Sequence, residues 1–231
     1  MLEKESPMRN GKKDEIRMAA IREDMLAEGF RLFAERGIES VNMQQVADTC
    51  HVGIATLYRY FRVKLDLVLA IGTRKWQEYS EYARALRKVH NADDMTAAQE
   101  LAFYLDFYID LYEHHKDLLR FNHNFNAYVR REGATPDQLA PYVQAIGQLE
   151  RFFHDLYEKG RRDGTIRTDM PEDKLFAATA HIMLAVVVRF AQGVLYDAER
   201  ESDRTEELRL LKKIILREFV TRSGGAHADR P

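Results

Sequence analysis

Residues 40–64, SVNMQQVADTCHVGIATLYRYFRVK, constrain the fold of this chain more than any other stretch. Apolar residues recur at helical spacing on both sides of a short turn, which predicts two short helices. Asn42, followed three residues later by Gln45, is a capping-box variant that opens the first helix. Gly53 is an acceptable N-cap for the second helix, which we expect over residues 54–61.

The second of these helices has distinct inner and outer faces. Leu57 and Phe61 lie four residues apart and are predicted to face inward, with Val46 and Val52 as partners. The residues left outward are Ile54, Ala55, Thr56, Arg59 and Tyr60. A helix of about two turns fits the major groove of DNA, which is roughly 12 Å wide, and tyrosine hydroxyls and cations supply phosphate contacts.

The rest of the chain also predicts helices. Only 5 Pro and 12 Gly occur in 231 residues, and apolar spacing marks helices at about 14–36, 64–90, 95–115, 117–131, 141–162, 171–196 and 204–221. Gly37 ends the first of them, and Gly29 within it predicts a close helix contact. With no convincing strand, the expected fold is all-α with about nine helices. An N-terminal three-helix domain precedes a larger helical body.

Four segments follow from this pattern. Residues 1–13 are predicted to form a flexible arm, either simply solvated or touching the DNA backbone or minor groove. We expect residues 14–63 to form the helix-turn-helix domain and 223–231 a disordered tail. Residues 64–222 are the candidate ligand-binding and dimerisation domain, for the reasons given below.

Charge and cysteine content limit the class of protein. The formal net charge is −2, so affinity for nucleic acid must come from a local patch, such as Arg59, Arg62 and Lys64. A single cysteine, Cys50, excludes an internal disulfide framework and fits a reducing cytoplasm. The N-terminus lacks the apolar core of a signal peptide. Polar residues interrupt the apolar run 176–195, so we expect no membrane helix and a cytoplasmic location.

The motifs LFAERGIESVNMQQVA and HVGIATLYRYFRVKLDLV resemble the N-terminal domain of the TetR family of bacterial transcriptional regulators. The resemblance covers about 45 residues, and the rest of the chain matches in helix number and length. It implies DNA contacts from Asn42, Gln44, Gly53, Ile54, Ala55, Thr56, Tyr58, Arg59, Tyr60 and Lys64. Asn42, Thr56, Tyr58 and Lys64 would contact the backbone, and residues 54–56, 59 and 60 would read bases.

Three residues depart from the family pattern. His51 replaces a usual Gly in the turn, where positive φ is often needed and which His tolerates better than most residues. Gly53 replaces a usual Ser cap. Val63 stands where a capping side chain is usual, so the start of the following helix is expected to be less well fixed.

The last two predicted helices are candidates for homodimer formation. Leu208, Leu211, Ile215 and Phe219 lie at helical spacing and suit a four-helix interface together with Ala178, Ala185 and Val188. Alternatively, both helices bury these faces within one chain. The resemblance favours the dimer, which would place two recognition helices about one duplex turn apart, roughly 34–36 Å.

Aromatic residues are frequent in the middle helices. They form either a packed core or a pocket for an unknown small-molecule effector of apolar or aromatic character. The candidate pocket residues are Phe103, Phe107, Tyr108, Phe121, Phe125, Tyr128, Phe152, Phe153, His181 and Arg189. Arg189 has an alternative role in an ion pair across the dimer. The resemblance implies a repressor, released when the effector shifts the helix that starts near Lys64.

Two other classes of protein remain as rivals. A helical-bundle enzyme would need a catalytic or metal motif, and the chain carries no Glu-x-x-His, GxSxG, GxGxxG or P-loop pattern. We therefore expect no catalytic residues, no metal site and no cofactor. An architectural DNA-binding protein without a ligand is the second rival, and it would not need the aromatic body.

Overall fold

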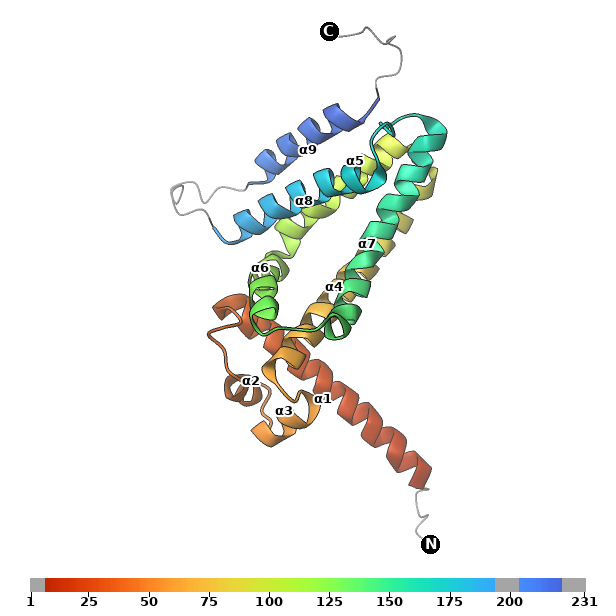
Figure 1. Ribbon diagram of the computed structural model, residues 1–231. Helices are drawn as coiled ribbons and strands as arrows, with labels where there is room; N and C mark the ends of the chain where they lie inside the picture. The colour runs from red at the N-terminus through yellow and green to blue at the C-terminus, as the bar shows by residue number, and fades with distance from the viewer. Residues whose placement is uncertain (1–6, 194–203, 222–231) are drawn as a thin grey trace. The chain divides into compact units, whose positions relative to one another are not determined.

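The computed structural model describes residues 7–193 and 204–221, with side chains described from residue 14 onward. The described chain is all-α, as predicted, and Figure 1 labels its helices. They are α1 (Pro7–Arg36), α2 (Met43–Thr49), α3 (Ile54–Tyr60), α4 (Lys64–Val89), the short 3₁₀ helix η1 (Ala92–Asp94), α5 (Ala97–His114), α6 (Lys116–Arg131), α7 (Pro136–Asp163), α8 (Glu172–Ala191) and α9 (Thr205–Phe219). The β structure in these residues is one isolated antiparallel bridge between Ile166 and Val220.

The first helix starts earlier than expected. Because α1 begins at Pro7, residues 7–13 of the predicted flexible arm are helical, and this part of the prediction is wrong. Proline is favoured in the first turn of a helix, where its missing N–H has no partner to lose. Residues 1–6 of the arm and the predicted disordered tail, 223–231, lie outside the described residues.

Two other helix boundaries differ from the prediction. The turn expected over residues 132–141 is shorter, because α7 begins at Pro136 and includes Pro141. The Thr135 hydroxyl accepts from the Gln138 amide (3.4 Å), and the Gln138 side chain accepts from the Thr135 amide (2.9 Å), so a capping box starts this helix. The helix α8 ends at Ala191, before the expected residue 196.

The chain divides into two compact units. The first contains the residues up to Arg74 together with Phe121–Tyr142. In this unit Gly29 of α1 lies so close to α4 that an added Cβ would come within 2.9 Å of the Ile71 side chain. The close helix contact predicted at Gly29 is therefore confirmed.

The second unit contains Lys75–Arg120 and the residues from Val143 onward. Helix α5 packs against both α8 and α9, as Figure 1 shows. At the N-terminal end of α5 the buried Glu100 is held by Arg87 and Lys159, each with an N–O distance of 2.5 Å. A buried carboxylate needs such compensation, so these ion pairs tie α4, α5 and α7 together within the unit.

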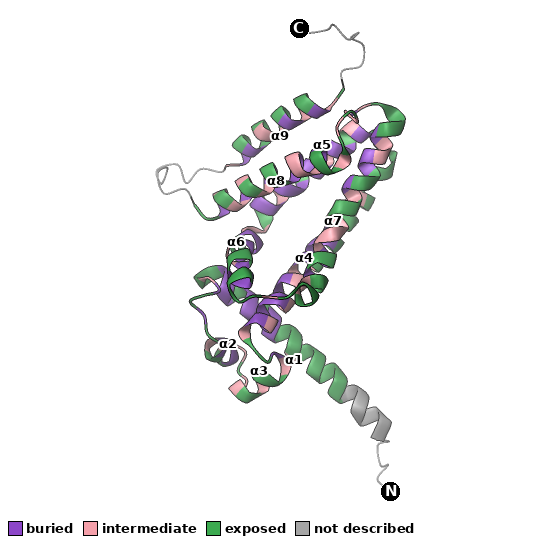
Figure 2. Ribbon diagram, in the orientation of Figure 1, coloured by how far each residue is buried: buried purple, intermediate pink, exposed green. Residues whose placement is uncertain are grey.

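Helix α8 is the one described helix long and apolar enough to cross a membrane, judged by length and composition alone. A single helix of this kind is weak evidence, because core helices of soluble proteins have the same properties. Figure 2 shows a mixture of buried and exposed residues along α8, and 33% of its most apolar stretch is buried.

Helices α4, α6 and α7 each contribute residues to both units. The predicted domain boundary between residues 63 and 64 stays a proposal, because the compact units divide α4 after Arg74 rather than at its start.

Candidate nucleic-acid interface

The start of α2 is held by a reciprocal capping box. The Asn42 side chain accepts from the Gln45 amide (2.9 Å), and the Gln45 side chain accepts from the Asn42 amide (2.8 Å). Met43, Val46 and Ala47 are buried beneath the helix, as predicted. Exposed Gln44 donates to Asp48 across one turn (2.7 Å), so its amide group is already engaged with a neighbouring carboxylate.

The turn between α2 and α3 has the strained geometry expected from the sequence. His51 has φ of 54°, a left-handed conformation that glycine adopts without cost. Gly53 is the N-cap of α3 and supplies no capping side chain, as predicted. Burial raises the pKa of the neighbouring Cys50 thiol to about 11, so this thiol is protonated at neutral pH.

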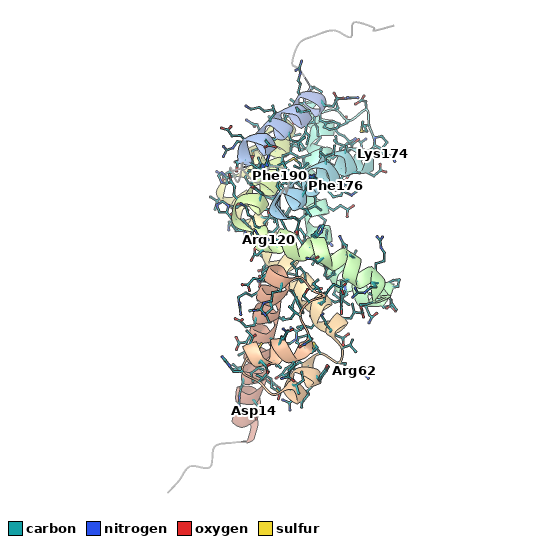
Figure 3. The ribbon with its side chains drawn as sticks, turned by 90° about the vertical axis from the view of Figure 1, so that its left-hand side faces the viewer. Asp14, Arg62, Arg120, Lys174, Phe176 and Phe190 are labelled. Atoms are coloured by element: carbon teal, nitrogen blue, oxygen red, sulfur yellow. The ribbon has the colours of Figure 1, made fainter. Side chains whose placement is uncertain are left out.

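Helix α3 presents one exposed face. Leu57 and Phe61 are buried, as predicted, while Ala55, Tyr58 and Arg59 are exposed. The Tyr58 side chain is 46% exposed, which leaves its hydroxyl accessible to a partner. Arg62 follows the helix and is also exposed; Figure 3 labels it. Gly53 is exposed as well, whereas Ile54 and Thr56 are half-buried.

Tyr60 departs from the expected outward orientation. Its hydroxyl oxygen is buried and has no hydrogen-bond partner among the described residues. The Arg59 guanidinium lies 5.9 Å from the centre of the Tyr60 ring. In this structure the Tyr60 ring supports Arg59, and its hydroxyl is not presented for reading bases.

Lys64 also differs from its expected role. Its ammonium donates to the backbone carbonyl of Ile38 in the loop after α1. It lies 5.7 Å from the Phe33 ring centre and 5.3 Å from that of Tyr128, both cation–π contacts. Partial burial lowers the pKa of Lys64, and the nearby carboxylates of Glu39 and Glu132 oppose this effect. Lys64 therefore holds the start of α4 against the domain instead of pointing to solvent.

The start of α4 is better held than the Val63 side chain suggests. The Asp66 carboxylate accepts from the Val63 amide (3.3 Å), and the Asp66 amide donates to the Val63 carbonyl (3.1 Å). Asp66 thus supplies half of a capping box from inside the helix. The signal was present in the sequence, as an acidic residue in the first turn.

The candidate pocket residues divide between the two units. Phe121, Phe125 and Tyr128 pack within the first unit; for example, Phe125 stacks on Tyr142 with ring centres 4.3 Å apart. Five others belong to the second unit, namely Phe103, Phe107, Tyr108, Phe152 and Phe153. His181 and Arg189 are exposed, so they do not line the interior of this protomer.

The described residues contain no group of three or more His, Cys, Asp or Glu side chains that could hold a metal ion.

The site consists of two short helices joined by a tight turn. The second helix carries exposed Tyr58 and Arg59, and exposed Arg62 follows it. This arrangement defines the class as helix-turn-helix DNA-binding proteins.

Comparison with known proteins identifies the family within that class. Residues 25–71 match the family described as bacterial regulatory proteins, tetR family. An HTH-type transcriptional regulator of Staphylococcus aureus strain MRSA252 is 28% identical over 149 residues, which cover 64% of this chain and 71% of that protein. A regulator from strain RF122 is 29% identical over 67% of this chain and 75% of its own length.

Solved structures share the fold. A putative transcriptional regulator from Saccharomonospora viridis in complex with choline superimposes with a TM-score of 0.70, at 18% identity, over 88% of this chain and 100% of its own. The transcriptional regulator FadR from Bacillus subtilis in complex with stearoyl-CoA superimposes with a TM-score of 0.62, at 14% identity. The match covers 84% of this chain and 96% of the FadR chain. Residues 25–71 thus carry the N-terminal domain of the TetR family, and the chain is similar to DNA-binding transcriptional regulators over about two thirds of its length.

Proposed function

We propose that this protein is a repressor that binds a palindromic operator as a homodimer and is released by a small apolar or aromatic effector. The observation that carries the proposal is the exposed face of α3, where Tyr58 and Arg59 stand outward on a helix held by Leu57 and Phe61. A cytoplasmic location follows from this role, because the operator is chromosomal DNA.

The exposed side chains divide by chemistry. Arg59 is the one long cation on the outer face of α3, and arginine reads guanine through two hydrogen bonds in the major groove. Tyr58, Arg62 and the side-chain NH₂ group of Asn42 suit phosphate contacts, which fix register but read no sequence. Ala55 allows the backbone of α3 to approach base edges closely. The remaining candidates for DNA contact are exposed Gln44 and Gly53 and half-buried Ile54 and Thr56.

The homodimer proposal concerns the outer faces of α8 and α9. Leu208, Ile215 and Phe219, expected at a dimer interface, are instead buried within the chain. Other apolar side chains on the two helices remain exposed: Ile182 by 45%, Leu210 by 59% and Ile214 by 58%. We therefore assign these three residues, in place of buried Leu208, Ile215 and Phe219, to the contact between protomers. The other expected interface residues stay candidates for it: Leu211, Ala178 and Val188 are half-buried, and Ala185 is exposed.

The effector is proposed to act inside the second unit. Its aromatic interior links α5 to α7 and α8 through ring contacts of Tyr104 with Phe153 (5.4 Å) and of Phe153 with Phe176 (5.2 Å); Figure 3 labels Phe176 on α8. The complexes of two structural relatives with choline and with stearoyl-CoA support an effector as a general feature of this fold. Helix α4 runs through both units, so an effector that favours one position of α4 would change the presentation of α3.

A mobility-shift experiment tests this function. Purified protein should retard a duplex carrying the sequence upstream of its own gene, and the affinity should fall as salt rises, with a log–log slope of about −2 for one phosphate-contacting cation, Arg62, on each of two protomers. A slope near zero, or no retardation at low salt, would contradict the regulator proposal.

The effector part is tested separately. A thermal-shift screen of lipophilic and aromatic compounds should find binders that also release the retarded duplex. Retardation that persists with every thermal-shift binder would favour an architectural DNA-binding protein.

A further inference from the structure

The chain contains a single tryptophan, Trp76 of α4, whose indole nitrogen finds no acceptor within the described part of the chain. The side chain is only 3% exposed, and Nε1 is buried without a hydrogen-bond partner among the described residues. A buried tryptophan usually donates its N–H, and leaving such a donor unpaired costs about 1–3 kcal/mol. An acceptor from outside the described protein groups, either water or a bound molecule, would remove this cost.

The neighbouring phenols do not supply that acceptor. The Trp76 ring contacts Tyr79 edge to face, with centres 6.1 Å apart. The Tyr79 hydroxyl donates to the Phe107 carbonyl (2.6 Å). Tyr104 and Tyr108 pair with each other through their hydroxyls (3.0 Å). One hydroxyl of this pair donates to the other, so the second phenol O–H and the Trp76 N–H both remain donors without an acceptor among the described residues. Of the two groups, the indole N–H is the one with no hydrogen-bond partner at all.

Charge in the second unit limits what the acceptor can be. Glu100 is the one buried charged side chain among the described residues. Its negative charge is balanced by ion pairs with Arg87 and Lys159. Exposed His181 and Arg189 are not available to the interior. A carboxylate at Trp76 would be buried without a countercharge, and a cation would face a group that only donates. A neutral carbonyl oxygen meets both conditions.

We propose that Trp76 Nε1 is the hydrogen-bond anchor for the effector, and that the effector is an apolar or aromatic molecule with a neutral carbonyl, such as a ketone or ester. This inference rests on the effector-responsive function proposed above and names the ligand class. The aromatic rings bind the body of the molecule, and Trp76 selects the carbonyl within it.

The probes are acetophenone and α-methylstyrene, which have nearly the same shape but carry C=O and C=CH₂ respectively. Calorimetry on the full chain should show about a tenfold tighter Kd for acetophenone, because one buried donor gains its acceptor. In ¹⁵N-labelled protein the single indole resonance should move downfield with acetophenone and stay within its linewidth with α-methylstyrene.

Variants complete the test. Trp76→Phe should bind both probes with equal Kd, whereas Tyr82→Phe, which removes an exposed hydroxyl on the same helix, should keep the tenfold ratio. Equal Kd values in the wild type with an unmoved indole resonance would overturn the anchor and leave the effector function standing. Binding of neither probe to the wild type would overturn the ligand class, and DNA release by compounds of another class would still uphold the function. If Trp76→Phe does not fold, the indole resonance of the wild type decides the question alone.

Discussion

Lys64 illustrates how a single side chain changes role with its surroundings. By its place at the start of α4 it was expected to contact phosphate, yet its ammonium donates to the Ile38 carbonyl and lies over two aromatic rings. Arg62, two residues earlier, is exposed and free to reach a duplex. We therefore expect the two cations to control different properties, stability for Lys64 and DNA affinity for Arg62.

This difference is measurable. Lys64→Met keeps the aliphatic stem and loses the donor, so we expect unfolding free energy to fall by about 1 kcal/mol. The salt slope of DNA binding should stay unchanged. Arg62→Ala should leave stability within about 0.5 kcal/mol, weaken binding to all sequences alike, and reduce the slope by about 1 for each protomer. If Lys64→Met instead reduced the salt slope and left the stability intact, Lys64 would be a phosphate contact as first expected.

At the scale of elements, the first unit depends on close contacts between helices. At Gly72 of α4 an added Cβ would come within 2.7 Å of the Phe125 ring and 3.2 Å of the Tyr142 ring. These rings are buried and stacked on each other, so they have no free direction in which to move. Gly147 of α7 has nothing within 4 Å of the corresponding position.

Alanine at these two glycines should therefore have opposite effects. Gly72→Ala should lower the free energy of unfolding by about 1–3 kcal/mol through overpacking. Gly147→Ala should raise it by up to about 1 kcal/mol, because alanine favours the helix more than glycine does. Urea denaturation at one fixed protein concentration measures both changes. Stabilisation by Gly72→Ala would mean that α6 does not lie against α4 as described.

At the scale of the whole molecule, pairing of two chains is proposed to set the spacing of the recognition helices. Ile214→Glu places a charge in the proposed α8–α9 interface, where burying it is costly. Light scattering should then report a mass near 27.0 kDa in place of twice that value. Val143→Glu is the control, because Val143 is a similarly exposed apolar residue on α7, and it should leave the dimer intact. Dissociation by Val143→Glu, or a dimer that tolerates Ile214→Glu, would place the interface elsewhere.

Local sequence signals predicted much of this molecule. The capping box of Asn42 and Gln45, the positive φ of His51 and the inward Leu57 and Phe61 each depend on residues close in the chain. The contact at Gly29 was predictable because glycine within a helix has a cost that a close neighbour explains.

Features that depend on distant residues could not be predicted in the same way. Lys64 turns inward because Phe33, Ile38 and Tyr128 meet there, and no spacing rule links these positions. Apolar residues occur on both faces of α9, so periodicity alone did not show which face is buried within the chain. The unpaired N–H of Trp76 is likewise a property of packing and not of sequence pattern.

The central claim, that α3 reads DNA sequence and is presented in pairs, is tested most directly by selection from a library of random duplexes. The wild-type protein should enrich an inverted repeat with half-site centres about one helical turn apart. Arg59→Ala should still bind DNA but lose the preference at one base pair of each half-site. Recovery of unenriched sequences by the wild-type protein, or of the same full motif by Arg59→Ala, would contradict it.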